Sequence, residues 1–355
     1  MEYPKFKVCV ECFTFNQSKY ITDTMNGFTM QNTDFPFVCC IVDDASTDGE
    51  QEVIMGYVND NFDLSEGSVY YQKETEYAHI TYARNKTNSN CFFAVLLLKE
   101  NHYSQHKSKE PYLTEWEDGV PYKAFCEGDD YWIDSDKLQK QFDFLEFHPD
   151  YILVHSNFSV VNAKGKLIEN NGSAKYQISE GEVYEDLFRG CWVKTLTVMY
   201  RKNPQIVFPQ LPDGCFAGDI FIFFVLSRYG KFHYMEEETG TYRTLTNSAA
   251  HYTDESRRFA FVNGLKKLDY FMIELYGASP EVVAELNHRW AITDFKHSLY
   301  ASDYAFYRRL DLSSVGQNEG RLALACRLCR CKPLFYLISA AVRVRIVFVR
   351  HLTQS

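Results

Sequence analysis

The alternation of short apolar runs with amphipathic stretches over the first 98 residues constrains the fold more than any other feature of this sequence. Strand-like runs are short and apolar, whereas the stretches between them repeat apolar side chains at helical spacing. The predicted elements are, in order, a strand at 6–13, a helix at 16–31, a strand at 35–42, a helix at 49–62, a strand at 68–73 and a helix at 82–98. Alternating strands and helices predict an α/β fold with a mostly parallel sheet and right-handed crossovers.

A dense acidic turn follows a further strand-like segment at 120–125. Glu127, Asp129 and Asp130 surround one glycine in the sequence CEGDD, and a helical pattern follows at 138–145. Two like charges about 4 Å apart repel by roughly 4 kcal/mol at an effective dielectric constant of about 20, so the turn needs a cation, an arginine or a proton. Carboxylate oxygens at the end of a strand suit Mg²⁺ or Mn²⁺ with substrate phosphates. The alternative is a solvated turn that caps the next helix.

A second acidic turn, VDDASTDGE, follows the predicted strand at 35–42. Asp43 and Asp44 end that strand, and residues 46–49 turn into the next helix. Because open α/β sheets bind ligands beyond the carboxyl ends of their strands, two acidic turns there indicate one ligand site. The sequence contains neither GxGxxG nor GxxxxGK[ST], which removes the main support for a dinucleotide or P-loop site.

The charge distribution separates an acidic body from a basic tail. The net charge of -10 argues against a general nucleic-acid binder, so we expect no nucleic-acid partner. Residues 321–355 contain seven Lys or Arg and no acid. No secretory signal is visible at the amino end, and eleven cysteines fit a reducing compartment, so we expect a cytoplasmic protein.

The basic tail at 321–355 predicts a surface helix. Its apolar run at 334–342 ends at Arg343, which is too short for a span of about 20 residues. One side of its helical wheel carries Lys332, Tyr336, Ser339, Arg343 and Arg350. This pattern is typical of a helix on an anionic membrane surface, here the inner face of the membrane, and the alternative is a helix docked on the acidic body or on a partner.

Five segments together resemble glycosyltransferase family 2, the inverting type with the nucleotide-diphospho-sugar transferase (GT-A) fold. They are VCVECFTFNQSKYI, IVDDASTDG, ARN at 83–85, EGDDYWIDSDKLQKQFDFLEFHP and GDIFIFFVLSRYGKF at 218–232. The resemblance extends from about Lys7 to Arg243. It implies a Rossmann-like GT-A domain, to which the helical patterns beyond residue 250 add a C-terminal helical module.

The resemblance assigns the donor-binding residues by position. It implies that Thr14 and Phe15 line the nucleotide pocket, with phenylalanine in place of the family's tyrosine. It also implies that Asp44, with Asp43 beside it, contacts the base, because a carboxylate can accept a pyrimidine N–H. Arg84 would face the pyrophosphate, where its forked donors fit.

The same resemblance assigns the reaction centre. Glu127 and Asp129 occupy the D-x-D metal positions, with glutamate replacing the first aspartate, and Asp130 follows them. Asp219 matches the catalytic base, although it could also cap the next helix; Asp213 is the alternative base. Arg243 resembles the family's loop residue over the donor phosphates.

The implied reaction is metal-dependent, inverting transfer of one sugar. The donor would be a nucleotide-diphosphate sugar, a UDP-sugar, and the acceptor a hydroxyl of a glycan or lipid-linked carrier in surface or extracellular polysaccharide synthesis. The motif LNHRW at 286–290 lacks the glutamine of the Q-x-x-R-W of processive synthases, so we interpret it as coincidence. The alternatives are a nucleotidyltransferase of related fold and a catalytically silent nucleotide-sugar-binding or membrane-docking protein.

The expected organisation has four parts. They are a nucleotide-sugar-binding half at 1–130, an acceptor-binding half at 131–250, a helical module at 251–320 and the basic tail at 321–355. Strands at 151–162 and 191–200 would continue the sheet towards the acceptor. His155 and Trp192 within them are either sugar contacts or core residues.

Overall fold

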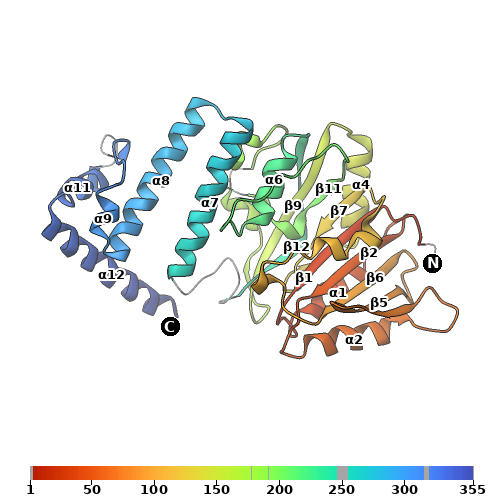
Figure 1. The fold of residues 1–355 in the computed structure, drawn as a ribbon. Helices are drawn as coiled ribbons and strands as arrows, with labels where there is room; N and C mark the ends of the chain where they lie inside the picture. The colour runs from red at the N-terminus through yellow and green to blue at the C-terminus, as the bar shows by residue number, and fades with distance from the viewer. Residues whose placement is uncertain (1–2, 177, 191, 246–254, 316–319, 355) are drawn as a thin grey trace. The chain divides into compact units, whose positions relative to one another are not determined.

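The chain forms two compact units. A computed structural model describes residues 3–176, 178–190, 192–245, 255–315 and 320–354 (Figure 1). The first unit comprises Met1–Gln210 and Gly218–Thr253, and the second comprises Leu211–Ala217 and Asp254–Ser355.

A twelve-stranded sheet, counted over the described residues, organises the first unit. Its order is β3-β5-β6-β2-β1-β7-β11-β9-β12-β8, with β10 on β9 and β4 on β5. The strands are β1 Val8–Thr14, β2 Phe37–Asp43, β3 Phe62–Asp63, β4 Tyr71–Glu74, β5 Ala78–Asn85, β6 Cys91–Leu98, β7 Tyr122–Phe125, β8 Tyr131–Trp132, β9 Tyr151–Asn162, β10 Leu167–Glu169, β11 Met199–Arg201 and β12 Lys231–Thr244. The central strands β6, β2, β1 and β7 are parallel, which confirms the predicted α/β class with a mostly parallel central sheet.

Helices and two apolar clusters cover the sheet. The helices of this unit are α1 Ile21–Thr29, α2 Glu50–Asn61, α3 Thr114–Glu117, α4 Lys137–Phe147, α5 Tyr184–Leu187 and α6 Gly218–Leu226. Ile21, Met25 and Phe28 repeat at helical spacing on α1, and all three are buried in the cluster that includes Cys12 of β1. Cys9, an odd number of residues earlier on the same strand, is buried in the other cluster, because neighbouring side chains of a strand point to opposite faces.

The helix predicted at 82–98 is wrong. This segment forms two strands, β5 and β6, joined by a turn in which the Asn85 side chain accepts from the amides of Thr87 and Asn88. The run CFFAVLLL of β6 is buried at every position, and a short, fully apolar run fits a central strand as well as a buried helix. β5 runs antiparallel to β6, with Arg84 opposite Phe92.

Of three segments predicted between residues 151 and 251, one agrees with the structure and two differ from it. The strand predicted at 151–162 matches β9 Tyr151–Asn162 and is confirmed. The one predicted at 191–200 is shorter, because a 3₁₀ turn, η4 Thr195–Thr197, precedes β11. The segment 240–251, expected to be a loop, continues β12 to Thr244, and residues 246–251 lie outside the described part of the chain.

The second unit is helical, as predicted for the C-terminal part. Its helices are α7 Glu255–Tyr276, α8 Pro280–Ala301, α9 Tyr304–Tyr307, α11 Gly320–Leu328 and α12 Lys332–Gln354. Phe295, Leu299, Tyr307 and Phe335 pack in one cluster. No helix in the described ranges is both long enough and apolar enough to cross a membrane.

The motif LNHRW lies inside α8 and serves this unit. Arg289 and the indole N–H of Trp290 both bind the Asp269 carboxylate, at 2.6 and 3.0 Å. The motif thus connects α8 to α7, in keeping with its interpretation as coincidence.

A buried ion triad on one face of the sheet makes the stability depend on pH. The Lys123 ammonium contacts the carboxylates of Glu11 and Glu117, and burial raises the pKa of Glu11 to about 8. The folded chain therefore keeps a proton that the unfolded chain releases at ordinary carboxyl pKa. We expect the free energy of unfolding to fall as pH rises from about 4.5 to about 8, by at most about 1.4 kcal/mol per pH unit from this group.

Glu11→Gln should remove this contribution, because the amide binds no proton. Urea unfolding at pH 5, 6, 7 and 8 measures it, with Glu52→Gln on the exposed face of α2 as the control that keeps the wild-type slope. Equal slopes of unfolding free energy against pH in wild type and Glu11→Gln would contradict the proton held by Glu11 in the folded chain.

Candidate functional site

Both acidic turns meet at the carboxyl end of β1. The parallel register pairs Thr14 of β1 with Asp43 of β2 and places β7 on the other side of β1 (Figure 1). Backbone hydrogen bonds connect the turns to β1, from Asp44 to the Thr14 carbonyl at 3.0 Å and from Gly128 to the Phe13 carbonyl at 3.3 Å. The structure therefore brings the turns together as the sequence predicts.

Glu127 and Asp129 form a pair of mutually repelling carboxylates. Burial, followed by the charge of Asp129, raises the pKa of Glu127 to about 7, and burial raises the pKa of Asp129. No group of three or more His, Cys, Asp or Glu side chains positioned for a metal occurs among the residues described. Two carboxylates nevertheless fit Mg²⁺ or Mn²⁺, which bind one or two carboxylates together with waters and substrate phosphates.

Asp130 and Arg243 clamp the turn from inside. The buried Asp130 carboxylate accepts from the Arg243 amide at 2.7 Å, and the Arg243 guanidinium donates to the Asp129 carbonyl at 2.9 Å and to Asp23 at 2.8 Å. The same guanidinium lies over the Tyr20 ring. Arg243 is only 4% exposed, so the structure places it under the turn, where it fixes the turn's shape. The prediction that it lies in a loop over donor phosphates is corrected accordingly.

Asp43 and Asp44 differ in what they bind. The Asp44 carboxylate accepts from the amides of His102 and Tyr103, at 2.8 and 3.0 Å, and from the Lys109 ammonium at 3.0 Å. Both oxygens of the Asp44 carboxylate thus accept hydrogen bonds from the long connection after β6. Asp43 uses one oxygen, Oδ1, for Ser46 and Gln51. Its buried Oδ2 has no hydrogen-bond partner within the described part of the chain.

The loop after β1 is fixed by Glu50, a residue that the sequence reading did not single out. The buried Glu50 carboxylate accepts from the Thr14 hydroxyl, from the Gln17 amide at 2.7 Å and from the Ser46 hydroxyl at 2.9 Å. Phe15 in this loop is 44% exposed. Thr14 therefore serves the loop's position, whereas Phe15 presents a ring to solvent beside the acidic turns.

Asp219 lies in the first turn of α6, near the turn at 127–130. This turn is named the metal turn, because its carboxylates Glu127 and Asp129 would hold a metal. Its exposed carboxylate accepts from the Thr195 hydroxyl at 3.4 Å, and its charge contributes to the raised pKa of Glu127. The adjacent Lys194 opposes that shift. The sequence did not predict that Lys194 and Thr195 lie at the site, because nothing in their local pattern distinguishes them from an ordinary strand. Asp213, the alternative base, belongs to the second unit, where its carbonyl accepts from Lys267.

Arg84 does not join this site, which corrects its predicted place at the pyrophosphate. Register pairs Arg84 with Phe92 near the start of β6, whereas Asp43 pairs with Leu97 near the end of that strand. Arg84 therefore lies towards the opposite end of the strands from the acidic turns. The physical reason is that β5 is an antiparallel strand, so its carboxyl end points away from those of β1, β2 and β7.

His155 and Trp192 are core residues rather than sugar contacts. Both are buried, and their rings lie 4.9 Å apart. Burial lowers the pKa of His155 to about 3, which keeps its imidazole neutral. The open alternative of the sequence reading is thus resolved towards the core.

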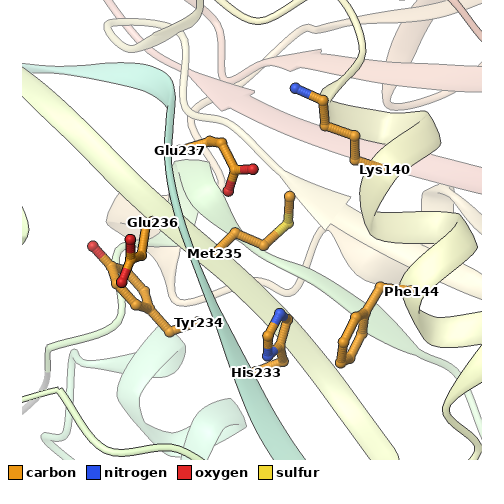
Figure 2. A pocket seen from close by; sticks show the side chains of 7 residues that line it. All are labelled: Lys140, Phe144, His233, Tyr234, Met235, Glu236 and Glu237. Carbon is orange, nitrogen blue, oxygen red and sulfur yellow. The ribbon is translucent and has the colours of Figure 1, made fainter.

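A hollow of about 600 Å³ lies elsewhere in the first unit and shares no residue with the metal turn. Lys140 and Phe144 of α4 and residues 233–237 of β12 line it (Figure 2). The His233 ring stacks on Phe144 at 3.8 Å. This part of β12 pairs with the first half of β9, whereas Arg243 pairs with Val161 near its end.

Comparisons with known proteins agree with this fold. No protein-family profile matches the sequence. Curated relatives include the uncharacterized proteins Mb1547 of Mycobacterium bovis and Rv1520 of Mycobacterium tuberculosis, each 24% identical over 246 residues, or 69% of this chain. The chain spans 61% of the length of these relatives.

Solved structures give a more extensive match. S. aureus TarS 1–349 in complex with UDP-GlcNAc has a TM-score of 0.55 and 16% identity, covering 95% of this chain and 92% of that one. The mannosyltransferase PcManGT from Pyrobaculum calidifontis, in complex with GDP-Man and Mn²⁺, has a TM-score of 0.52 and 14% identity, covering 96% and 89%. The chain therefore has a glycosyltransferase-type α/β fold with a C-terminal helical region, as predicted.

Gly128 tests the packing of the metal turn on β1. A Cβ at this position would lie 2.1 Å from the Thr14 hydroxyl oxygen and 2.6 Å from Gln17 Oε1. Gly128→Ala should therefore push the turn from β1 and lower the free energy of unfolding by about 1–3 kcal/mol, as measured by urea unfolding.

Gly56→Ala in α2 is the matched control, because an added Cβ there meets nothing within 4 Å. A helix interior favours alanine over glycine, so this variant should be more stable by about 0.5–1 kcal/mol. Similar gains in both variants would show that the turn does not approach β1 closely in solution.

Proposed function

We propose that this protein is a metal-dependent, inverting glycosyltransferase. It would move one sugar from a nucleotide-diphosphate sugar, a UDP-sugar, to a hydroxyl of a glycan or lipid-linked acceptor in surface or extracellular polysaccharide synthesis. The observation that carries the proposal is that Glu127 and Asp129 follow β7 at the carboxyl end of a parallel sheet, with Asp219 near enough for its charge to raise the pKa of Glu127. The ligands of the similar structures, UDP-GlcNAc in one and GDP-Man with Mn²⁺ in another, support it.

The metal site would be formed by Glu127 and Asp129. Mg²⁺ or Mn²⁺ bound there supplies charge stabilisation for the departing diphosphate. The two carboxylates repel each other without a cation, and this repulsion favours binding. Asp130 and Arg243 hold the backbone of the turn, so that both carboxylates face the ligand.

The nucleobase would be read by Asp43. Its Oδ2 is buried and has no hydrogen-bond partner over the described residues, so it could accept an N–H from a base that enters below the present surface. The resemblance names Asp44 for this contact, but the carboxylate of Asp44 holds the connection after β6. The exposed ring of Phe15 supports a stacking surface beside it.

Asp219 would act as the general base. In an inverting transfer the acceptor hydroxyl attacks the anomeric carbon from the face opposite the diphosphate, so one carboxylate near the acceptor must take the hydroxyl proton. Asp219 is exposed and oriented by the Thr195 hydroxyl. No second carboxylate is needed as a nucleophile.

Two other functions remain as rivals. A nucleotidyltransferase of related fold is expected to carry a glycine-rich phosphate loop after β1, and FTFNQS at 13–18 is not one. A catalytically silent binding protein would bind nucleotide without turnover. Asp219 separates this rival from an enzyme, because a binder does not need a base.

Nucleotide binding is the first test. Calorimetric titration of UDP, and separately of GDP, into metal-free protein should show micromolar UDP binding only when Mn²⁺ is present. Asp129→Ala should abolish the metal-dependent part, because one of two metal carboxylates is lost. Failure of both nucleotides to bind with Mn²⁺ present would overturn the proposed function.

Turnover is the second test. Asp219→Asn should retain UDP binding and lower the release of UDP from a UDP-sugar by about 10²–10⁴-fold, the usual contribution of a general base. Asp213→Asn, the alternative base, is the control and should turn over like wild type. The reverse result would transfer the role to Asp213, and indifference of both variants would favour the silent binder.

We further propose that the protein works at the cytoplasmic face of an anionic membrane and contacts it through α11 and α12. Phe335 and Ser339 of α12 are buried, and the Ser339 hydroxyl contacts Ser302 at 2.6 Å, so Ser339 does not belong to the free face predicted for it. The side chain of Arg350 lies outside the described part.

The free side of these helices combines apolar and basic groups. Leu337 is 67% and Val344 69% exposed. The exposed cations close to them in sequence are Arg327, Arg330, Lys332 and Arg343. Apolar side chains flanked by cations complement an anionic bilayer surface.

Vesicle flotation tests this contact. Wild type should float with phosphatidylglycerol vesicles and less with phosphatidylcholine vesicles. Leu337→Glu should reduce flotation about fivefold or more, because it places a negative charge in the apolar stripe. Leu167→Glu, an exposed leucine of β10 in the first unit, is the control. Equal flotation of all three proteins, or none by wild type, would overturn the proposal.

A further inference from the structure

Neither arginine that the family resemblance assigns to the donor phosphates is available to bind them. Arg243 is clamped under the metal turn, and Arg84 lies towards the opposite end of the strands. A nucleoside diphosphate carries more negative charge than one divalent cation on two carboxylates can offset. A further cation near the turn is therefore needed.

Lys194 is a cation in the right place. It directly precedes η4, and its ammonium lies 5.1 Å from the centre of the Tyr242 ring, one residue before the clamp Arg243. On its other side Thr195 donates to Asp219. Lys194 is thus next in sequence to the residue that contacts the proposed base, and its ammonium lies on the neighbour of Arg243, whose guanidinium binds the metal turn.

The backbone around Lys194 is held firmly. The Trp132 indole donates to the Leu196 carbonyl at 2.7 Å, and the Gln141 amide donates to the Thr197 carbonyl at 2.7 Å. The Thr197 hydroxyl donates to the carbonyl of Lys194 itself, also at 2.7 Å. Both anchoring side chains are buried. The lysine therefore extends from a fixed platform, which limits the entropy lost on binding a ligand.

The charge of the Lys194 ammonium is available to an anionic ligand. Its charge favours the ionised forms of Glu127 and Asp130 and so opposes the rise in their pKa. Among residues that the structure describes, no carboxylate forms an ion pair with it; its assigned contact is the face of the Tyr242 ring. A half-buried cation beside an aromatic face and a metal turn suits phosphate oxygens.

We propose that Lys194 binds the diphosphate of the donor and stabilises it as it departs, an inference that rests on the proposed function. In that reaction the acceptor oxygen bonds to the anomeric carbon. The bond from that carbon to the diphosphate oxygen breaks, and its electron pair goes to the diphosphate. The hydroxyl proton goes to Asp219. The Lys194 ammonium donates hydrogen bonds to the phosphate oxygen that gains the charge.

Three ligands and two variants, measured beside wild type, test the role of Lys194. Calorimetry with Mn²⁺ would compare UDP, UMP and uridine on wild type, Lys194→Met and Lys194→Arg. Lys194→Met keeps a side chain of similar length against Tyr242 but removes the charge. It should weaken UDP binding about 10- to 100-fold, as expected for a lost charge-assisted hydrogen bond, and leave uridine binding unchanged. Lys194→Arg should restore most of the UDP affinity.

Lys164→Met, an exposed lysine of the first unit, is the matched control and should bind all three ligands like wild type. Wild-type UDP affinity in Lys194→Met would overturn the role of Lys194 and leave the proposed function intact. Equal loss of uridine and UDP binding would also overturn it, because the lysine would then act only on the shape of the pocket. Absence of UDP binding by wild type would overturn the proposed function together with this inference.

Discussion

The close approach of the metal turn to the end of β1 is the constraint on which the site depends. Gly128 leaves no room for a side chain against Thr14 and Gln17, and its amide donates to the carbonyl of Phe13. On the other side of β1, the amide of Asp44 donates to Thr14. One strand end therefore sets the distance between the turn that would hold a metal and the turn that would read a base.

The charged side chains at this strand end form two sets: one set stabilises the loops, and the other would act on a ligand. Asp44, Asp130, Glu50 and Arg243 are buried and make hydrogen bonds within the protein that hold the surrounding loops. The groups that would act on a ligand under the proposed function are the carboxylates of Glu127 and Asp129, one oxygen of Asp43, the exposed Asp219 and the ammonium of Lys194. Fixing the first set in advance lets the second set act without reorganisation when a ligand binds.

The periodic parts of the fold could be predicted from sequence, and the sheet partners could not. Strands β1, β2 and β9 and helices α1, α2 and α4 follow from apolar spacing, since each buries one face or both. The failure at 82–98 has a physical cause: a fully apolar run has no period that separates a central strand from a buried helix. The place of Arg84 at the pyrophosphate was implied by the family resemblance, and the antiparallel direction of β5 puts this residue beside the start of β6 instead.

By itself the sequence determined the fold class and the identity of the residues in the two acidic turns, because strand ends and turn residues are local features. Only the tertiary structure decided which of those carboxylates are bonded within the protein. Asp43 and Asp44 are neighbours in sequence, yet one keeps an unpaired oxygen and the other binds a connection more than fifty residues away. Lys194 and Thr195 reach the turn only because the chain returns to it through η4, β11 and β12, and contacts between distant segments leave no local pattern.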